Sequence, residues 1–393
     1  MRPDPLAYLA ADLQALRDEG LYRHLRVLDG EQAARTSIDH RLVVNLSSNN
    51  YLGLTTHPTL RERAVEATRT LGVGAGSVRT IAGTMDIHLQ LERRLAEFKR
   101  TEAVVVFQSG FAANAGTVSA LLGPDDVIVS DELNHASIID GARLSRAAIK
   151  VFPHRDVAAA RRILEGVPRT HRTLLISDGV FSMDGDLGAL PALCDLAEEF
   201  GCILMVDDAH ASGVFGRQGR GTIDHFGLHG RVDVQVGTLS KAFGVLGGYV
   251  AGSRALVEIL YHRARPFLFS TSHPPAVAAA CLAAIEVLES EPELLDRLWD
   301  NTRFFKAGLG ALGFNTGASE SPITPVIVGD AGLAMTLSDR LFEKGVFAQG
   351  IGFPTVPRGK ARVRTIVTAT HTRDQLQFAL DCFKTVGTGL GVI

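Results

Sequence analysis

The chain has 393 residues, of which 46% are hydrophobic and 21% are charged, and its formal net charge is -3. This composition is typical of a globular protein with a large core, and it provides no excess positive charge to attract nucleic acid or an anionic membrane. The longest apolar stretch, residues 276–285, is too short to cross a bilayer. The N-terminus has no signal-peptide core, and the four cysteines lack metal-ligand spacing. We therefore expect a cytoplasmic protein with no metal, nucleic-acid or membrane partner.

Residues 1–45 are predicted to form an N-terminal arm. Leu6, Leu9, Leu13 and Leu16 have the spacing of one helix face, and Gly20 can end that helix. A polar, turn-like stretch is expected to follow to about residue 40.

Residues 46–275 are predicted to form a large α/β domain with a mainly parallel sheet. From Ala103 onward, short apolar runs alternate with helical patterns, which is typical of strands joined by helices. The expected strands are 103–107, 127–130, 173–177, 202–206, 232–236 and 248–251, and the expected helices include 86–98, 111–121, 156–165 and 191–200.

Residues 276–393 are predicted to form a smaller C-terminal α+β domain, because the pattern changes after Pro274-Pro275. Long helical segments are expected at 276–289, 293–312, 331–344 and 372–390, with short strands near 323–328 and 362–367.

Two glycine-containing segments of the large domain resemble phosphate-binding loops. Gly110 joins a predicted strand to a helical stretch, and free N–H groups at such a helix start can bind a phosphate, although many similar segments are only turns. The segment 72–83 does not have the G-x-G-x-x-G spacing, since position 77 is Ser, and a helix rather than a strand is expected before it. We expect a flexible loop there that lines a site.

Asp207 and Lys241 carry the strongest chemical signal. Asp207 ends the apolar run 202–206, and Lys241 lies among Gly, Thr and Ser after the predicted strand 232–236. An acid that keeps a pyridine nitrogen protonated and a lysine that forms a Schiff base are what a pyridoxal phosphate (PLP) enzyme requires. On its own, Asp207 could be a capping residue after a strand, and Lys241 could be a solvated residue of a loop. Because Gly110, Asp207 and Lys241 all follow predicted strands, they are expected at one ligand-binding edge of the sheet.

Several further polar residues leave alternatives open. His135 could lie flat on an aromatic cofactor or could cap a helix. Asp207, Asp208 and His210 could hold a divalent metal ion, although no second histidine cluster supports that interpretation. Arg364 is expected on a strand, where its guanidinium could bind a substrate carboxylate through two hydrogen bonds or could simply face solvent.

Taken together, these motifs resemble the α-oxoamine synthase family of fold-type I PLP enzymes over nearly the whole chain. The matching runs are 49–54, 109–111, 134–141, 178–185, 207–210, 238–241, 269–272 and 362–364. The resemblance implies a fold-type I transferase with a seven-stranded type of α/β sheet in its large domain, with PLP as cofactor, and an obligate homodimer with shared active sites. It also implies a small amino acid, glycine or alanine, and an acyl-CoA as substrates.

The resemblance further implies a role for each matching residue. Lys241 would form the Schiff base and move the Cα proton, Asp207 would pair with the pyridine nitrogen, and His135 would stack on the ring and assist the developing oxyanion. The other implied residues are Gly110, Phe111 and Thr238 for the phosphate, Ser270 and Thr271 for the phosphate of the neighbouring subunit, Ser182 and His210 for the phenolic oxygen, Asp208 as a further cofactor-binding residue, Arg364 for the amino acid carboxylate, and Asn50 from the partner chain.

Within the family, the runs 77–84, 138–141 and 265–269 look most like glycine C-acetyltransferase (2-amino-3-ketobutyrate CoA ligase). We therefore expect condensation of glycine with acetyl-CoA to 2-amino-3-oxobutyrate and CoA, as in threonine degradation. The run 109–111 is also similar to 8-amino-7-oxononanoate synthase, which joins a pimeloyl thioester to L-alanine with decarboxylation in biotin synthesis. That enzyme, or one that performs both reactions, is the alternative. A PLP aminotransferase and a non-enzymatic protein of the same fold are more remote alternatives.

A pimeloyl chain ends in a carboxylate, which would favour a cation in the acyl site. Arg23 and Arg26 follow the predicted N-terminal helix and are the candidates, with Arg23 as the predicted substrate-binding residue. Both could equally be solvated residues of the arm.

Overall fold

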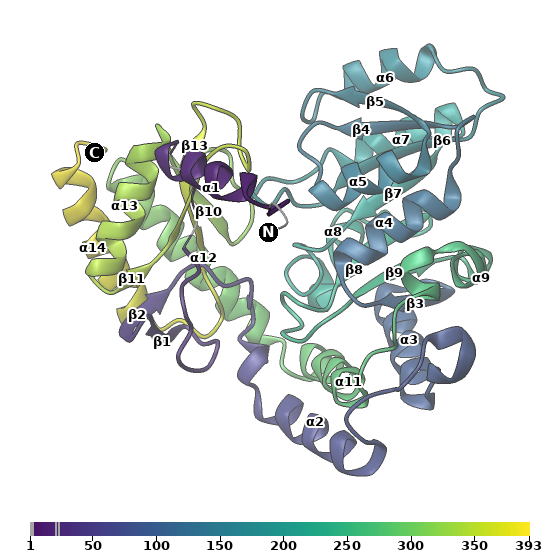
Figure 1. Cartoon of the computed structure of the whole chain (residues 1–393), viewed down its shortest axis with the longest axis horizontal. Coiled ribbons are helices and arrows are strands. Elements are labelled where there is room, and N and C mark those ends of the chain that lie inside the picture. Colours follow the sequence, from purple (N-terminus) through teal and green to yellow (C-terminus); the bar gives the residue numbers. More distant parts are fainter. Residues whose placement is uncertain (1–3, 20–21, 23) are drawn as a thin grey trace.

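The computed structural model describes residues 4–19, 22 and 24–393. Its central element is a seven-stranded sheet with the strand order β3, β9, β8, β7, β6, β4, β5 (Figure 1). Strand β9 runs in the opposite direction to the other six strands, which are parallel to one another and all end at the same edge. The strands are β3 (Ala103–Phe107), β4 (Val127–Asp131), β5 (Ala148–Phe152), β6 (Thr173–Asp178), β7 (Ile203–Asp207), β8 (Val234–Thr238) and β9 (Gly248–Gly252).

Helices cover both faces of this sheet because its central strands are apolar on both sides. Alternate residues of one strand belong to different cores: Val105 packs with α4, α5, α9 and α10, whereas Val104 and Val106 pack with α3 and α11. Helices α6 and α7 extend the second layer beside β4, β6 and β7. The bounds are α3 (Asp86–Lys99), α4 (Gly110–Leu121), α5 (Ala136–Ser145), α6 (Val157–Glu165), α7 (Leu190–Phe200), α8 (Thr222–His225), α9 (Arg254–Arg263), α10 (Arg265–Leu268) and α11 (Pro275–Ser290).

This arrangement confirms the predicted α/β class and the six predicted strands of the sheet. The seventh strand, β5, was not predicted, and it lies at the edge of the sheet with four of its five residues exposed. The segment 72–83 is also more ordered than expected, since it contains a π-helical turn, η2 (Arg79–Gly83). The Arg79 guanidinium forms two hydrogen bonds, of 2.8 and 2.9 Å, with the buried Glu92 carboxylate and anchors that turn.

The C-terminal part combines a small antiparallel sheet with long helices, as predicted. Strand β13 (Ala361–Ile366) lies between β10 (Ile323–Gly329) and β12 (Gln349–Ile351), and its core includes residues of α12 (Glu293–Ala311), α13 (Ala331–Glu343) and α14 (Arg373–Gly389). Helix α11, which begins at the predicted boundary near residue 275, packs against α2 (Pro58–Leu71) and α3. The division into 1–45, 46–275 and 276–393 stays a prediction.

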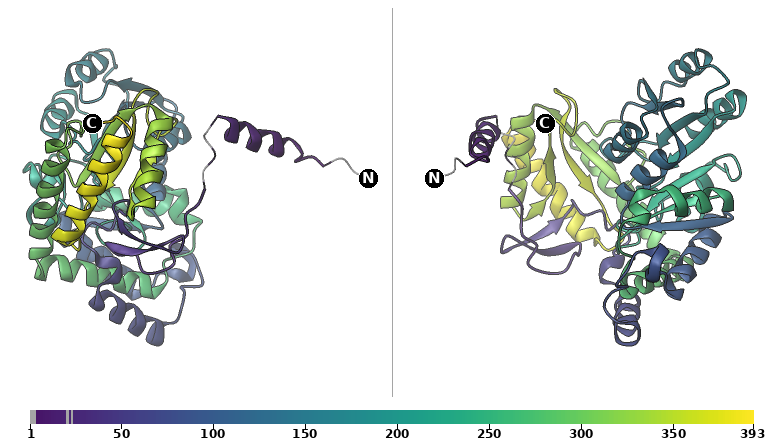
Figure 2. Two further views of the ribbon diagram at one scale, coloured as in Figure 1. Left: turned by 90° about the vertical axis from the view of Figure 1, so that its left-hand side faces the viewer. Right: turned by 45° about the vertical axis from the view of Figure 1, so that its right-hand side comes forward.

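The N-terminal arm contains the predicted helix, α1 (Tyr8–Asp18), which extends away from the rest of the chain and has no buried residue (Figure 2). The stretch up to residue 40 is not all turn, because β1 (Arg35–Ile38) pairs with β2 (Arg41–Asn45). Strand β2 also pairs in parallel with β11 (Val346–Phe347), so the end of the arm joins the C-terminal part. No helix in the described ranges is both long enough and apolar enough to span a membrane.

Candidate active site

The predicted site residues gather at the sheet edge where the six parallel strands end. Gly110 begins the helix after β3, His135 follows β4, Ser182 follows β6, Asp207 is the last residue of β7, and Lys241 follows β8. Each of these groups therefore comes from the end of a different strand of the sheet. The sheet topology brings together residues that lie up to 131 positions apart in the sequence.

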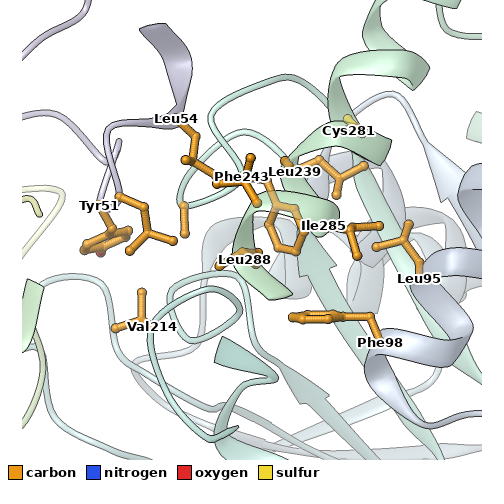
Figure 3. Close-up of a cluster of buried hydrophobic side chains, with 14 of the residues drawn as sticks. Tyr51, Leu54, Leu95, Phe98, Val214, Leu239, Phe243, Cys281, Ile285 and Leu288 are labelled. Atoms are coloured by element: carbon orange, nitrogen blue, oxygen red, sulfur yellow. The ribbon is translucent and has the colours of Figure 1, made fainter. Parts of the chain in front are cut away.

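Lys241 is held by a loop whose neighbouring side chains are buried. Leu239, Ala242 and Phe243 are at most 1% exposed, and Phe243 lies inside the cluster in Figure 3, edge-to-face with Phe98. The loop closes through a 2.9 Å hydrogen bond from Gly244 N to Lys241 O. Burial and the positive charge of Arg364 lower the pKa of Lys241 to about 8, although the carboxylates of Asp207 and Asp178 oppose this shift. A lysine of this kind can be a neutral amine near physiological pH.

Asp207 is a buried carboxylate that is bonded on both oxygens. Its Oδ1 accepts a hydrogen bond from Ala209 N (2.8 Å), and its Oδ2 accepts one from Asn114 Nδ2 (2.6 Å). Asn114 Nδ2 also donates to Ser137 Oγ at 2.9 Å. These donors fix the carboxylate at the strand end and stabilise its negative charge.

His135 joins the same hydrogen-bond network. Its Nδ1 lies 2.7 Å from Ser137 Oγ and accepts a hydrogen bond from Ser137 N at 3.2 Å, so the ring proton is placed on Nε2. Desolvation by the surrounding protein and the charge of Lys241 lower its pKa, although Asp207 opposes this shift. His135 is also the N-cap residue of α5, so the capping and ring-stacking interpretations are compatible.

His210 is fixed by a buried tyrosine. Tyr51 Oη lies 2.8 Å from His210 Nδ1. Burial, together with the positive charges of Lys241 and Arg364, lowers the pKa of His210 well below its usual value, and burial raises that of Tyr51. Tyr51 therefore donates to the neutral ring, and His210 keeps its proton on Nε2 as a donor for the site.

Arg364 reaches the site from β13. It donates from Nη1 to Ser182 O (2.9 Å) and from Nη2 to Asn49 Oδ1 (3.2 Å), which leaves other guanidinium N–H groups for an anion. Arg362, on the same strand face, forms a 2.6 Å ion pair with Asp184 and is only 2% exposed. The two arginines therefore differ: Arg362 anchors the segment after β6, and Arg364 can bind a ligand.

The N-terminus of α4 forms a compact anion cradle. Ser109 caps the helix, and its Oγ accepts a hydrogen bond from Ala112 N. A Cβ atom on Gly110 would lie 3.4 Å from Thr238 Cβ, in van der Waals contact, so the absent side chain leaves space between the helix start and Thr238. Thr238 Oγ1 bonds to Gly247 O at 2.8 Å and lies 2.7 Å from Ser240 Oγ. Free N–H groups at a helix start favour a phosphate here.

Ser270 and Thr271 lie outside this cradle on an accessible segment. Thr271 is exposed, Ser270 is half-buried, and the segment is fixed by a bridge between Thr271 and Val78. Gln108 Nε2 also donates to Thr271 O at 2.8 Å. This placement leaves both hydroxyls accessible to a second chain, as the predicted role requires.

Asp208 does not share the site with Asp207. Its carboxylate is fully buried, forms a 3.2 Å ion pair with Lys99, and accepts hydrogen bonds from the backbone and hydroxyl of Thr222. Lys99 also bonds to Ser212 Oγ and Arg220 O. Neighbouring strand residues point to opposite faces, which places Asp208 away from the cofactor side. Its assignment as a cofactor-binding residue stays a prediction that this ion pair does not support.

Replacing Lys99 with Met is expected to lower the free energy of unfolding by about 3–5 kcal/mol, because it leaves the buried Asp208 charge unpaired. Urea unfolding followed by circular dichroism measures this loss. The double variant Lys99→Met/Asp208→Asn should recover part of it. A loss below about 1 kcal/mol would instead indicate a pair no stronger than a surface ion pair.

Two other candidate substrate-binding residues, Asn50 and Arg26, are bonded to other parts of the chain. The Asn50 amide donates to Gln32 O and accepts from Thr55 N of its own chain, so its assignment to a partner's site stays a prediction. Arg26 is not a free cation, since it pairs with Asp39 and Asp339 and lies over the Phe342 ring. The predicted substrate-binding residue Arg23 lies outside the described residues. Within those residues, no three or more His, Cys, Asp or Glu side chains are grouped to hold a metal ion.

The residues that are present fit PLP. A buried amine of lowered pKa, a buried carboxylate with its own donors and a helix start without a Cβ match the aldehyde, the ring nitrogen and the phosphate of that cofactor. Sequence reasoning missed the residues that position this set, namely Asn49, Tyr51, Asn114, Ser137 and Asp178. Four of these five lie inside the matching runs 49–54, 134–141 and 178–185, which was the available signal.

Comparison with known proteins agrees with this geometry. The model of the family "Aminotransferase class I and II" matches residues 41–383. The 8-amino-7-oxononanoate synthase of Symbiobacterium thermophilum is 62% identical over 98% of this chain and 99% of that protein. The 8-amino-7-oxononanoate synthase 1 of Bacillus subtilis is 53% identical over 96% of each. A solved serine palmitoyltransferase from S. paucimobilis, with a bound PLP–myriocin aldimine, superposes with a TM-score of 0.94 at 32% identity, covering 99% of this chain and 100% of that one.

Proposed function

Because the chain belongs to the α-oxoamine synthases, the PLP-dependent acyltransferases of fold type I, we propose that it is an 8-amino-7-oxononanoate synthase. The reaction joins a pimeloyl thioester to L-alanine and releases CO2 and the thiol. The observation that carries this proposal is the 62% identity, over 98% of the chain, to a protein of that name. The function preferred from the sequence, glycine C-acetyltransferase in threonine degradation, is less well supported than this alternative.

Each residue of the site has a proposed task in this reaction. When bound, PLP supplies an electron sink for the amino acid Cα. Lys241 would hold the cofactor through a covalent bond and, once released as a neutral amine, would take the proton from Cα. Asp207 would favour a proton at the ring nitrogen, and His135 would stack on the ring and donate from Nε2 to the thioester oxygen as it gains charge. Arg364 binds and orients the amino acid carboxylate.

The remaining contacts hold the cofactor in place. His210 Nε2 and Ser182 serve the phenolic oxygen, and the N–H groups of Gly110 and Phe111 with the Thr238 hydroxyl bind the phosphate. We propose a homodimer in which Ser270 and Thr271 of one subunit reach the phosphate in the other. Their accessibility supports this arrangement.

A direct assay tests the proposed function. The purified enzyme is incubated with pimeloyl-CoA and carboxyl-labelled L-alanine, and thiol and labelled CO2 are measured together. We expect both to be released in equal amounts, and acetyl-CoA with glycine to react more slowly. A faster reaction of acetyl-CoA with glycine would instead favour glycine C-acetyltransferase as the function. Amino exchange with a keto acid, without thiol release, would indicate an aminotransferase.

The turnover rate is expected to rise with pH up to about 8. The free Lys241 amine takes the proton only when neutral, and a pKa of about 8 in place of 10.5 increases its neutral fraction at pH 7 about 300-fold. The pKa of Lys241 in the folded enzyme, about 8, is lower than the ordinary value of 10.5. The protonated, inactive form of Lys241 therefore accumulates as the pH falls below 8. The pH dependence of kcat at saturating substrates measures this limb. A rate that is flat between pH 6 and 8 would contradict the assignment.

A further inference from the structure

Three strands of the large sheet that lie side by side each end in an aspartate. They are β4 with Asp131, β6 with Asp178 and β7 with Asp207, and these residues are only 3%, 4% and 5% exposed. Burying a carboxylate is costly unless its charge is paired or hydrogen-bonded. The three residues differ in how the surrounding protein meets that requirement.

Asp131 is an ordinary paired carboxylate. It accepts hydrogen bonds from the backbone of Leu133 and Arg155, both at 2.9 Å, and forms a 3.1 Å ion pair with His154. Although burial opposes it, bonding to Asp131 and Asp186 raises the pKa of His154 to about 9, so the partner is charged at neutral pH. The register of β4 and β6 pairs Ser130 with Ile176. Asp131 is therefore level with Ser177 and faces the opposite side from Asp178.

Asp178 and Asp207 face the same side of the sheet. They are register partners in the parallel pair β6–β7, and such partners carry their side chains on the same face. Asp207 has a donor on each oxygen, from Asn114 and Ala209. Two neighbouring buried carboxylates disfavour simultaneous ionisation, so the better-solvated one keeps the charge.

Asp178 lacks the compensation that Asp207 has. Its Oδ1 is buried without a hydrogen-bond partner, although its backbone N–H is held by Asn134 Oδ1 at 2.8 Å. Burial and the negative charges of Asp207 and Asp131 raise the pKa of Asp178 well above its usual value. The backbone N–H of His135 and the charge of Lys241 oppose this shift without cancelling it.

We propose that Asp178 is held as an uncharged carboxylic acid in the working enzyme, so that Asp207 is the one ionised carboxylate of the β6–β7 pair beside Lys241. A second negative charge there would stabilise the ammonium form of Lys241 and would compete with Asp207 for a proton. Asp178 is thus a positioning residue that acts through these two groups. The inference rests on their proposed roles, and it does not depend on which acyl thioester is used.

Infrared spectroscopy tests the protonation state directly. The holoenzyme, carrying aspartate labelled with ¹³C at its side-chain carboxyl, is compared with Asp178→Asn at pH 7.5. We expect a protonated-carboxyl C=O band in the wild type that is missing in the variant. The matched control Asp131→Asn should remove a carboxylate band and keep the acid band. If Asp178→Asn does not fold, Asp178→Ser takes its place. A wild-type spectrum without the acid band, or a band that survives substitution of Asp178, would overturn the proposal.

Kinetics gives a second, independent readout. Asparagine imitates the neutral acid, so Asp178→Asn should keep kcat within about tenfold of the wild type. The acidic limb of its pH profile should not move. If Asp178 were ionised, removing its charge would lower the pKa of Lys241 and move that limb to lower pH, which would contradict the proposal. A wrong choice of acyl substrate would slow the wild type and the variant alike but would leave the infrared band unchanged, so the two failures are distinguishable.

Discussion

Replacing Lys241 with Ala is expected to lower kcat by about 10⁴-fold or more, because one change removes both the covalent link to PLP and the base that takes the Cα proton. The loss is measured as thiol release from pimeloyl-CoA with saturating alanine. The neighbouring residues Leu239, Ala242 and Phe243 hold the loop by their own burial. The variant should therefore fold with nearly wild-type stability, so that the loss reports on chemistry.

Lys241→Arg is the matched control for this experiment. Arginine keeps the length and the positive charge but cannot form the link or act as a neutral base. It should therefore be as inactive as the alanine variant. Borohydride reduction of the wild-type holoenzyme, followed by peptide mapping, should place the cofactor on Lys241. Wild-type turnover by Lys241→Ala, or a reduced adduct on another lysine, would refute the mechanism.

Replacing Asp207 with Asn is expected to lower kcat by about a hundredfold or more, since an amide cannot balance a proton at the ring nitrogen. Asn114 would then meet an amide in place of a carboxylate, which weakens the network to Ser137 and His135. The variant should also lose PLP faster on dialysis, which absorbance of the retained cofactor measures.

Asp178→Asn serves as the control for Asp207→Asn. It makes the same chemical change one strand away and should keep kcat within about tenfold of the wild type. Equal losses in the two variants would show that the negative charge is shared, and that Asp207 has no special place at the ring nitrogen.

The sequence predicted most of the large sheet because its strands are buried on both faces and read as continuous apolar runs. Strand β5 was not predicted, because most of its residues are exposed at the edge of the sheet. Ile149 and Val151 are exposed and flank Lys150 at the sheet edge, so the strand has no apolar run of that kind. The pairing of β1 with β2 was not predicted because β1 lies in a polar stretch, although Thr36 and Ile38 of this strand are buried.

At the candidate site, the sequence identified residues that perform chemistry better than residues that position them. Lys241 and Asp207 follow apolar strands and were found by that pattern. Asp208 has the same neighbours in sequence, yet it faces Lys99, whose position 109 residues earlier gives no local signal. Asn114 was equally hidden, since its contact with Asp207 depends on how α4 lies on the sheet.

The sequence motifs did not distinguish between the candidate acyl substrates. The motifs that support the resemblance surround the cofactor, and every member of the family handles the same cofactor. They therefore identify the family without identifying the acyl chain. Arg26 illustrates the difficulty: it was a reasonable partner for a distal carboxylate, but Asp39 and Asp339 already neutralise it.

One helix connects the two ends of the proposed cofactor site. Gly110 begins α4 at the phosphate cradle, and Asn114, one turn or about 6 Å further along, bonds to Asp207. A rigid helix transmits any displacement along its axis to both places together. A substitution that shifts α4 relative to the sheet is therefore expected to disturb phosphate binding and protonation of the ring nitrogen at the same time. Neither property can be changed alone by moving this helix.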